Sequence, residues 1–232
     1  MLTVRDLNKS FSNLHVLKDI SFEVQAGESI ALMGKNGAGK TTLLRILARI
    51  AALDQGVITF KNRDLVKDGS DARKFMLYLG HQPALYPSLT AIENLQLALS
   101  LRKQAGTEKS IISVLKDAGL SRQNFDPISV YSQGMLQRLK LALANIINWD
   151  LLLFDEPFTG LDSEGIKSVD NFLKFSREGR RSYMLVLHNL ERALEHCSRF
   201  IFLSGGKIGA DLSLKNESKL NIRNTFKKLL EN

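Results

Sequence analysis

Short apolar runs recur along the chain, and each ends in a glycine or a polar residue. The runs at 29–33, 75–79, 151–154 and 183–187 are almost continuously apolar, as strands buried on both faces of a parallel sheet are. Residues 20–24 alternate between apolar and polar side chains, which is typical of a strand with one exposed face. We therefore predict β-structure in the N-terminal part and buried sheet strands after it.

Helical spacing of apolar residues fills the segments between these strands. Leucines and isoleucines follow residue 40 at helical spacing, and Thr90 with Glu93 forms a capping box at the start of an amphipathic helix. Further helices are predicted at 111–118 and 133–147, so residues 82–148 form a largely helical insert. Strands that alternate with helices in this way indicate an α/β fold built on an open sheet.

The C-terminal third continues the same alternation. Residues 162–175 and 191–197 are predicted helices, and an apolar strand with the turn Gly205-Gly206 is typical of a closing hairpin. From Asp211 onward we predict a short, basic, amphipathic helix.

Composition narrows the class of protein. A chain of 232 residues suits one domain, or one domain with a subdomain, and its net charge of +8 comes from basic residues scattered among acidic ones. Without a basic stripe, an ordinary mixed surface is favoured over a nucleic-acid interface. The single cysteine, Cys197, excludes an internal disulfide and a cysteine-based zinc site. With neither a signal-peptide pattern nor ~20 consecutive apolar residues, the chain is expected to be soluble and cytoplasmic.

A glycine-rich segment between the strand at 29–33 and the following helix has the pattern G-x-x-x-x-G-K-[ST], the phosphate-binding loop. Its glycines let backbone N–H groups turn inward around phosphate oxygens, and the helix N-terminus favours an anion. The pattern predicts that Lys40 reaches the β- and γ-phosphates and that the Thr41 hydroxyl holds Mg²⁺. The predicted nucleotide-binding residues of this segment are Gly34, Lys35, Asn36, Gly37, Ala38, Gly39, Lys40, Thr41 and Thr42.

Three other apolar strands end in polar residues suited to phosphate chemistry: Gln82, the pair Asp155-Glu156, and His188. In a doubly wound sheet such strand ends face one crevice together with the phosphate loop. Asp155 is placed to help hold Mg²⁺, and Glu156, one residue on, to act on the attacking water as general base. His188 is a candidate donor to the γ-phosphate, and Gln82 a candidate contact of the metal or the water.

Phe11 is an aromatic residue within the polar stretch 8–13. Two interpretations stay open on this pattern alone: a local hydrophobic plug, or a face on which a base stacks.

Taken together, these segments resemble the nucleotide-binding subunit of ABC transporters over essentially the whole chain. The resemblance implies an ABC ATPase fold in one domain, 1–232: a core with a β-subdomain (1–81 and 149–210), a helical subdomain (82–148) and a basic tail (211–232). It also implies that Phe11 stacks on adenine, that Gln82 contacts the metal, that Asp155 ends Walker B, that Glu156 is the catalytic glutamate and that His188 is the switch histidine. Thr159–Asp162 matches the D-loop of the family.

The signature segment of the family, usually LSGGQ, corresponds here to Tyr131–Met135. Ser132 and Gly134 are kept, whereas Gln133 replaces the first glycine and Met135 the glutamine. The segment still opens a helix, so Ser132 and the Gly134 N–H are expected to grip a γ-phosphate.

The resemblance further implies an ATP- and Mg²⁺-dependent ATPase that works as a head-to-tail dimer, with itself or a relative, on the cytoplasmic face of a separate membrane permease. The compact chain and the segment 187–192 are most similar to small exporter-type ATPases of the haem or drug type. The alternative is a soluble ABC-type ATPase acting on ribosomes or nucleic acid. Relatives of that kind carry two cassettes or a long coiled coil, which this chain lacks.

Overall fold

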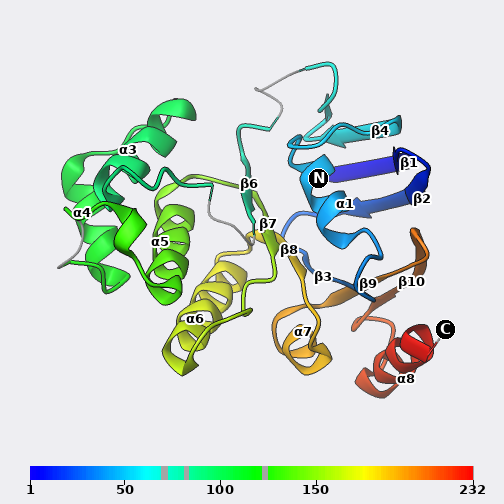
Figure 1. Cartoon of the computed structure of the whole chain (residues 1–232). Helices are drawn as coiled ribbons and strands as arrows, with labels where there is room; N and C mark the ends of the chain where they lie inside the picture. The colour runs from blue at the N-terminus through cyan, green and yellow to red at the C-terminus, as the bar shows by residue number, and fades with distance from the viewer. Residues whose placement is uncertain (69–72, 81–83, 122–124, 232) are drawn as a thin grey trace. The chain divides into compact units, whose positions relative to one another are not determined.

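The computed structural model describes residues 1–68, 73–80, 84–121 and 125–231 (Figure 1). These residues divide into two compact units. The first unit comprises Met1–Tyr78, Asp150–Pro157 and Ser176–Asn232, and the second comprises Leu79–Trp149 and Phe158–Phe175. Residues 158–175, which the sequence analysis assigned to the core, group here with the inserted helices.

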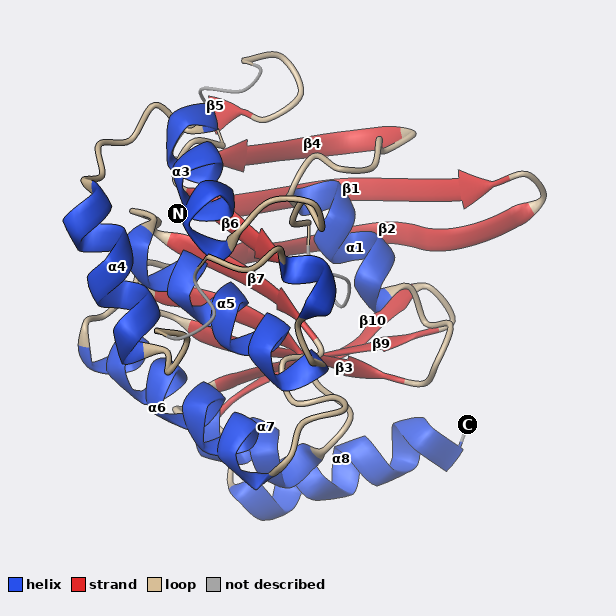
Figure 2. Cartoon of the chain, turned by 60° about the vertical axis from the view of Figure 1, so that its left-hand side comes forward, coloured by secondary structure: helices blue, strands red, loops and turns tan. Residues whose placement is uncertain are grey.

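An antiparallel sheet forms the N-terminal part of the first unit. Its strands lie side by side in the order β2-β1-β4-β5 (Figure 2). One face of β2 is apolar and buried through Ile20, Phe22 and Val24, as the alternating pattern predicted. The strands are β1 (Leu2–Phe11), β2 (Leu14–Val24), β4 (Gln55–Phe60) and β5 (Arg63–Asp64).

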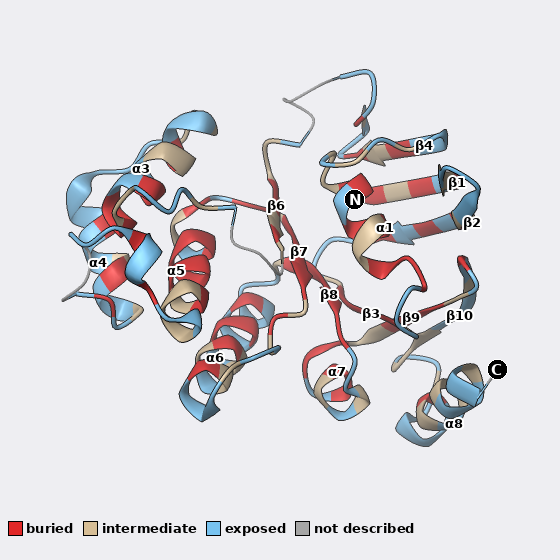
Figure 3. Ribbon diagram, viewed as in Figure 1, coloured by how far each residue is buried: buried red, intermediate tan, exposed pale blue. Residues whose placement is uncertain are grey.

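A second sheet provides the strand ends at which the predicted polar residues stand. It has the order β10-β9-β3-β8-β7-β6, with β9, β3, β8 and β7 paired in parallel and β10 antiparallel to β9. Every residue of β7 and β8 is buried, which explains their continuous apolar runs (Figure 3). The strands are β3 (Ser29–Gly34), β6 (Met76–Leu79), β7 (Leu151–Asp155), β8 (Ser182–Val186), β9 (Arg199–Ser204) and β10 (Lys207–Ser213).

Within its described residues, the first unit contains the helices α1 (Lys40–Leu47), α7 (Leu190–His196) and α8 (Lys219–Glu231). The prediction of a helix from Asp211 was wrong at its start. Asp211 lies in β10 opposite Ile201, and its carboxylate accepts two hydrogen bonds from Arg199, at 2.7 and 2.6 Å. Strand pairing with β9 therefore holds residues 207–213 extended, and the helix begins only at Lys219.

The second unit is helical, as the insert was predicted to be. The capping box is present at α3: the Thr90 hydroxyl accepts from the Glu93 N–H, and the Glu93 carboxylate accepts from the Thr90 N–H. Trp149 is buried and donates to the Ala144 carbonyl at 2.7 Å. The elements are α3 (Ala91–Leu101), α4 (Glu108–Asp117), the 3-10 helix η1 (Ile128–Val130), α5 (Gln133–Ile146) and α6 (Ser163–Glu178), whose last three residues group with the first unit.

The length and apolarity of a helix decide whether it can cross a membrane. Among the described residues, none of the helices combines enough length with enough apolar character to span a bilayer.

Candidate functional site

A cavity of about 410 Å³ opens in the first unit at the carboxyl ends of its parallel strands. The loop after β3, the residue after β7 and the segment after β8 all reach it, because parallel strands end at one edge of a sheet. The cavity is lined by Val16, Asn36, Gly37, Gly39, Lys40, Thr41, Thr42, Glu156 and His188.

The phosphate-binding loop needs glycine at two of its positions. At Gly34 (φ 149°) a Cβ atom would lie 2.2 Å from the Leu203 carbonyl oxygen, and at Gly39 (φ 98°) it would lie 2.7 Å from Leu17 Cδ2. Gly39 is also the N-cap of α1 and has no side chain with which to cap the helix. The first N–H groups of α1 are therefore available to an anion in the cavity.

Lys40 is buried at the start of α1 and folds back over the loop. Its Nζ donates to the carbonyl oxygens of Gly34 and Lys35, both at 2.9 Å. Burial lowers the pKa of the Lys40 ammonium, and the charges of Glu156 and Asp155 oppose that shift. The cavity thus contains a cation that backbone dipoles hold beside the phosphate loop.

Asp155 is the last residue of β7 and is 2% exposed. Its Oδ1 accepts a hydrogen bond from the Thr41 hydroxyl at 3.2 Å, and Tyr78 Oη lies 3.4 Å from its Oδ2. Burial is the main cause that raises the pKa of this carboxyl above its ordinary value. A buried carboxylate beside a hydroxyl is an oxygen donor set that fits Mg²⁺.

Glu156 and His188 are in direct contact. His188 Nε2 lies 2.8 Å from Glu156 Oε1, although the residues are 32 positions apart in the chain. Glu156 has a φ of 51°, a left-handed conformation that is uncommon for a non-glycine residue. The pair stands at the cavity beside the loop, as a base and its orienting group would.

The remaining predicted contacts of the nucleotide are placed as follows. Phe11 is the last residue of β1 and is 51% exposed, which argues against a hydrophobic plug. Gln82 lies outside the described residues.

Two residues at the site, Val16 and Tyr78, were not predicted from the sequence. Val16 belongs to no motif, whereas a lone hydroxyl within the apolar run 75–79 was a signal that could have indicated Tyr78.

The signature segment lies in the second unit, at a cavity of about 310 Å³. Ser132 is exposed and is the N-cap of α5, where its hydroxyl accepts from the Met135 N–H at 3.3 Å. Gly134 has only the Ser132 hydroxyl near its Cβ position, at 4.0 Å. The cavity is lined by Ser132, Gln133, Gly134, Arg138, Gly160, Asp162, Glu164 and Gly165, so the signature and D-loop segments share it.

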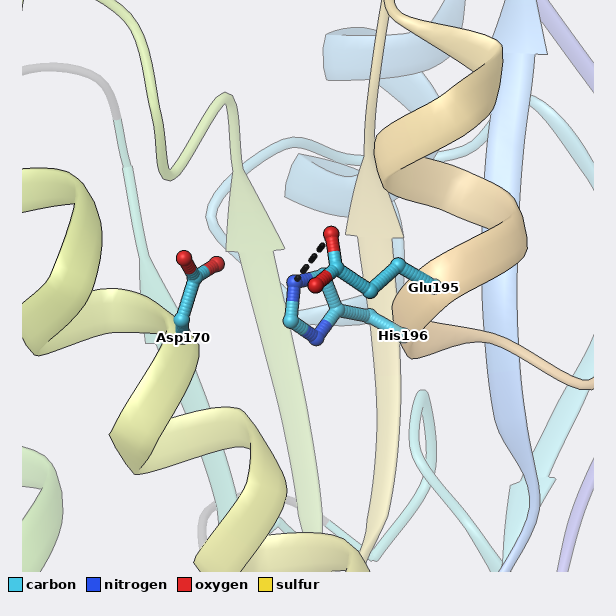
Figure 4. Close-up of side chains that lie close together, drawn as sticks. All are labelled: Asp170, Glu195 and His196. Carbon is cyan, nitrogen blue, oxygen red and sulfur yellow. Dashed lines mark ion pairs between the residues drawn. The ribbon is translucent and has the colours of Figure 1, made fainter.

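An ion pair at the end of α7 stands apart from the cavity at the strand ends. His196 Nε2 lies 3.8 Å from Glu195 Oε2 (Figure 4), and Tyr183 Oη donates to the His196 carbonyl at 2.6 Å. Neither His196 nor Glu195 lines that cavity. The Tyr183 hydrogen bond joins β8 to the end of α7, whereas the ion pair lies within α7 itself.

A phosphate loop, a Walker-B carboxylate and a glutamate–histidine pair around one cavity define a P-loop nucleotide-binding protein. The ABC transporter family model matches residues 17–159, and the chain belongs to this family of ATPases. The chain is 32% identical to the cytochrome c biogenesis ATP-binding export protein CcmA of Vibrio cholerae, over 77% of this chain and 87% of that protein.

Two further likenesses support the assignment. The chain is 34% identical to the arginine transport ATP-binding protein ArtM of Bacillus subtilis, over 91% of this chain and 90% of that protein. It is also similar to the structure of a dimeric ATP-binding cassette in a post-hydrolysis state bound to ADP and Pi. That likeness has a TM-score of 0.83 at 25% identity, over 92% of this chain and 99% of that one. The resemblance and the fold class predicted from the sequence are both confirmed.

Proposed function

We propose that the cavity at the strand ends binds ATP with Mg²⁺ and hydrolyses it to ADP and phosphate. The observation that carries this is the grouping of Lys40, Glu156 and His188 around one phosphate loop. Lys40 leaves its two carbonyl partners for the β- and γ-phosphates, while Thr41 and Asp155 hold the metal ion, which neutralises phosphate charge. Gln82 is proposed as a further metal contact.

Glu156 acts as the general base toward the attacking water. Its carboxylate is within hydrogen-bond distance of His188 and is held at the cavity by the left-handed backbone. When the imidazole turns to the γ-phosphate, the carboxylate is released to accept a proton from water. The backbone N–H groups of 36–42 and the exposed ring of Phe11 bind the rest of the nucleotide.

Two chains form the working unit, arranged head to tail. In this arrangement, Ser132 and the Gly134 N–H of one chain grip the γ-phosphate held by the loop of the other. The exposed Ser132 at the N-terminus of α5 supports the role, because a helix N-terminus attracts an anion. Closure then depends on the γ-phosphate, which is a ligand of the closed state only. The partition into core (1–81 and 149–210), helical subdomain (82–148) and tail (211–232) stays a prediction.

The closing motion is passed to a separate integral membrane permease at the cytoplasmic face of the membrane, through the surface around Gln82 and residues 86–93. Export of a haem- or drug-type cargo is the preferred transport reaction, on the likeness to a cytochrome c biogenesis export protein. A soluble ATPase acting on ribosomes or nucleic acid is disfavoured, since the described relatives carry transport names.

Co-purification from gently solubilised native membranes tests this function. A tagged chain is expected to bring a polytopic membrane protein with it in stoichiometric amount, and the ATPase rate of that complex should respond to its cargo. The chain with Lys40→Ala is the control for ATP dependence. Recovery only from the soluble fraction with ribosomes or nucleic acid would overturn the transporter function and favour the alternative.

A further inference from the structure

A tight set of contacts surrounds the residues just before Phe11, outside every segment assigned so far. Asp54 stands immediately before β4 and faces the end of β1, across 44 positions of sequence from Ser10. One oxygen of its carboxylate accepts from Lys9 Nζ at 2.7 Å, and the other accepts from the Ser10 backbone N–H at 2.7 Å. Its own N–H donates to the Asn8 carbonyl at 3.0 Å.

These three hydrogen bonds hold residues 8–10, which immediately precede Phe11 in β1. The Asn8 carbonyl, the Lys9 ammonium and the Ser10 N–H are all bound by the single residue Asp54. Both side-chain bonds are short and charge-assisted, and such bonds are stronger than those between neutral groups. The same two bonds lower the pKa of the Asp54 carboxyl, the one from Lys9 most.

Lys9 connects this set directly to the aromatic ring. Its Nζ lies 5.0 Å from the centroid of the Phe11 ring, within the range of a cation–π contact, and its side chain is only 12% exposed. The ammonium therefore stands over one part of the ring while the ring as a whole stays half exposed. An exposed phenyl group at the end of a hairpin strand would otherwise sample several rotamers.

We propose that Asp54 is a positioning residue of the base-binding platform: through Lys9 and the Ser10 N–H it fixes Phe11 in the orientation in which a nucleotide base stacks. This inference rests on the proposed function, in which Phe11 contacts adenine. The physical gain is preorganisation, because a ring that is already ordered loses less entropy when the base binds. Asp54 itself touches no part of the nucleotide.

If Asp54 acts through Phe11, its replacement should weaken the binding of ligands that contain a base more than the binding of those that lack one. Asp54→Ala should weaken the binding of ATP about three- to tenfold, less than the loss in Phe11→Ala, since stacking on an aromatic side chain contributes roughly 1–3 kcal/mol per base. The affinity for inorganic triphosphate, which has no base, should change less than about twofold. Asp54→Asn keeps an acceptor for the Ser10 N–H but loses the ion pair, so its effect should be intermediate.

The test is a double-mutant cycle measured by calorimetric titration of the full chain with ATP and, separately, with triphosphate. In the Phe11→Ala background, Asp54→Ala should change ATP affinity less than about twofold, because the platform is already absent. Glu23→Ala, an exposed acid at the other end of the β1–β2 hairpin, removes the same charge and should leave both affinities unchanged. Thermal unfolding of each variant verifies that it is folded.

The outcomes separate the inference from the function on which it rests. If Asp54→Ala weakens ATP and triphosphate equally, or weakens ATP as much without Phe11 as with it, Asp54 does not act through the ring. If Phe11→Ala itself binds ATP like the unaltered chain, the platform is wrong and this inference with it. If the unaltered chain binds triphosphate and ATP at equal strength, no base is recognised; if it binds neither, the proposed function fails as well.

Discussion

Asp155 is a buried carboxylate that accepts a hydrogen bond from Thr41, a lining residue of the cavity at the strand ends. We expect its replacement to affect stability and activity in opposite directions. The carboxyl is 2% exposed and burial raises its pKa, so the ionised form is less favourable in the folded than in the unfolded chain. The Thr41 hydroxyl donates to the buried carboxylate, and in the proposed function a metal ion would compensate its charge.

Replacing this carboxylate should therefore stabilise the empty protein and inactivate it. We expect Asp155→Asn to raise the midpoint of thermal unfolding without nucleotide, by roughly 1–3 °C, and to lower ATP turnover more than about tenfold. Scanning calorimetry and a phosphate-release assay measure the two effects. Asp117→Asn, at an exposed position on α4, is the control and should change neither. A lower midpoint for Asp155→Asn would contradict the prediction.

Glu156 should matter for turnover and hardly for binding. Glu156→Gln keeps the shape of the side chain and its contact with His188 but cannot accept a proton from water, so hydrolysis should fall more than about a hundredfold. ATP should still bind, and the bound state should persist as a dimer. Size-exclusion chromatography with light scattering at saturating ATP measures the dimer, with Glu178→Gln as a charge-matched control. A monomeric Glu156→Gln chain, where the unaltered chain dimerises, would show that the role is misassigned.

The predictability of the candidate site depends on how far apart its residues are in sequence. The loop Gly34–Thr41 was predictable because its function lies in eight consecutive residues. Asp54 was not, because its partners Lys9 and Ser10 are 45 and 44 positions away. The hydroxyl of Tyr78 within an apolar run was a signal, but its partner Asp155, 77 positions away, was not predictable. No pattern in a single sequence specifies such pairs, since only the folded sheets bring them together.

At the scale of elements, β3 and the loop that follows it are fitted against β9. Gly34 ends β3 opposite Leu203, whose carbonyl oxygen lies 2.2 Å from where a Cβ atom would stand. The obstacle is backbone in a buried strand, which cannot move aside without loss of sheet pairing. The glycine that begins the phosphate loop is thus also required by the packing of the sheet.

Gly34→Ala should consequently destabilise the fold by more than about 2 kcal/mol, through overpacking against β9. Gly205→Ala is the matched control: it lies in the β9–β10 turn at φ 55° with nothing within 4 Å of the Cβ position, so only the left-handed backbone is penalised, by about 1 kcal/mol. Urea unfolding of both variants gives the comparison. Equal destabilisation would mean that the Leu203 carbonyl is not the cause.

Strands and helices with a strong pattern were predicted well, and the C-terminal segment shows where the pattern fails. The capping box of α3 and the buried strands β7 and β8 were present as expected. The closing hairpin predicted through Gly205-Gly206 is present, and Ile208, Ala210 and Leu212 alternate with polar residues or glycine in 207–213. The error was to begin the helix at Asp211, where the strand still continues. Pairing with β9 and the two hydrogen bonds from Arg199 to the Asp211 carboxylate decide the structure of this segment, and both are tertiary effects.

At the scale of the whole molecule, the two parts of the proposed reaction belong to different compact units. The phosphate loop, Glu156 and His188 line a cavity in the first unit, and Ser132 with Gly134 lines a cavity in the second. In the proposed head-to-tail dimer, each complete site takes one half from each chain. A defect in either half can then be complemented by a second chain with the opposite defect.

Mixing experiments test this division. Lys40→Ala and Ser132→Arg should each abolish hydrolysis when present alone, the first through the loop and the second by blocking the γ-phosphate contact. An equimolar mixture should regain part of the activity, because each mixed dimer contains one site with both halves intact. Coupled phosphate release on the mixture, with each variant alone as control, is the measurement. A mixture as inactive as its components would contradict the shared site.

Lys40 Nζ donates to the carbonyl oxygens of Gly34 and Lys35. In the proposed function, these two carbonyl oxygens occupy the hydrogen-bonding positions of the ammonium that phosphate oxygens take in the complex with nucleotide. Arrival of the nucleotide exchanges one set of partners for another instead of creating contacts from nothing, and departure reverses the exchange. An ATPase must release ADP in every cycle. Because Lys40 can return to backbone acceptors when the nucleotide leaves, release does not leave a buried ammonium without hydrogen bonds.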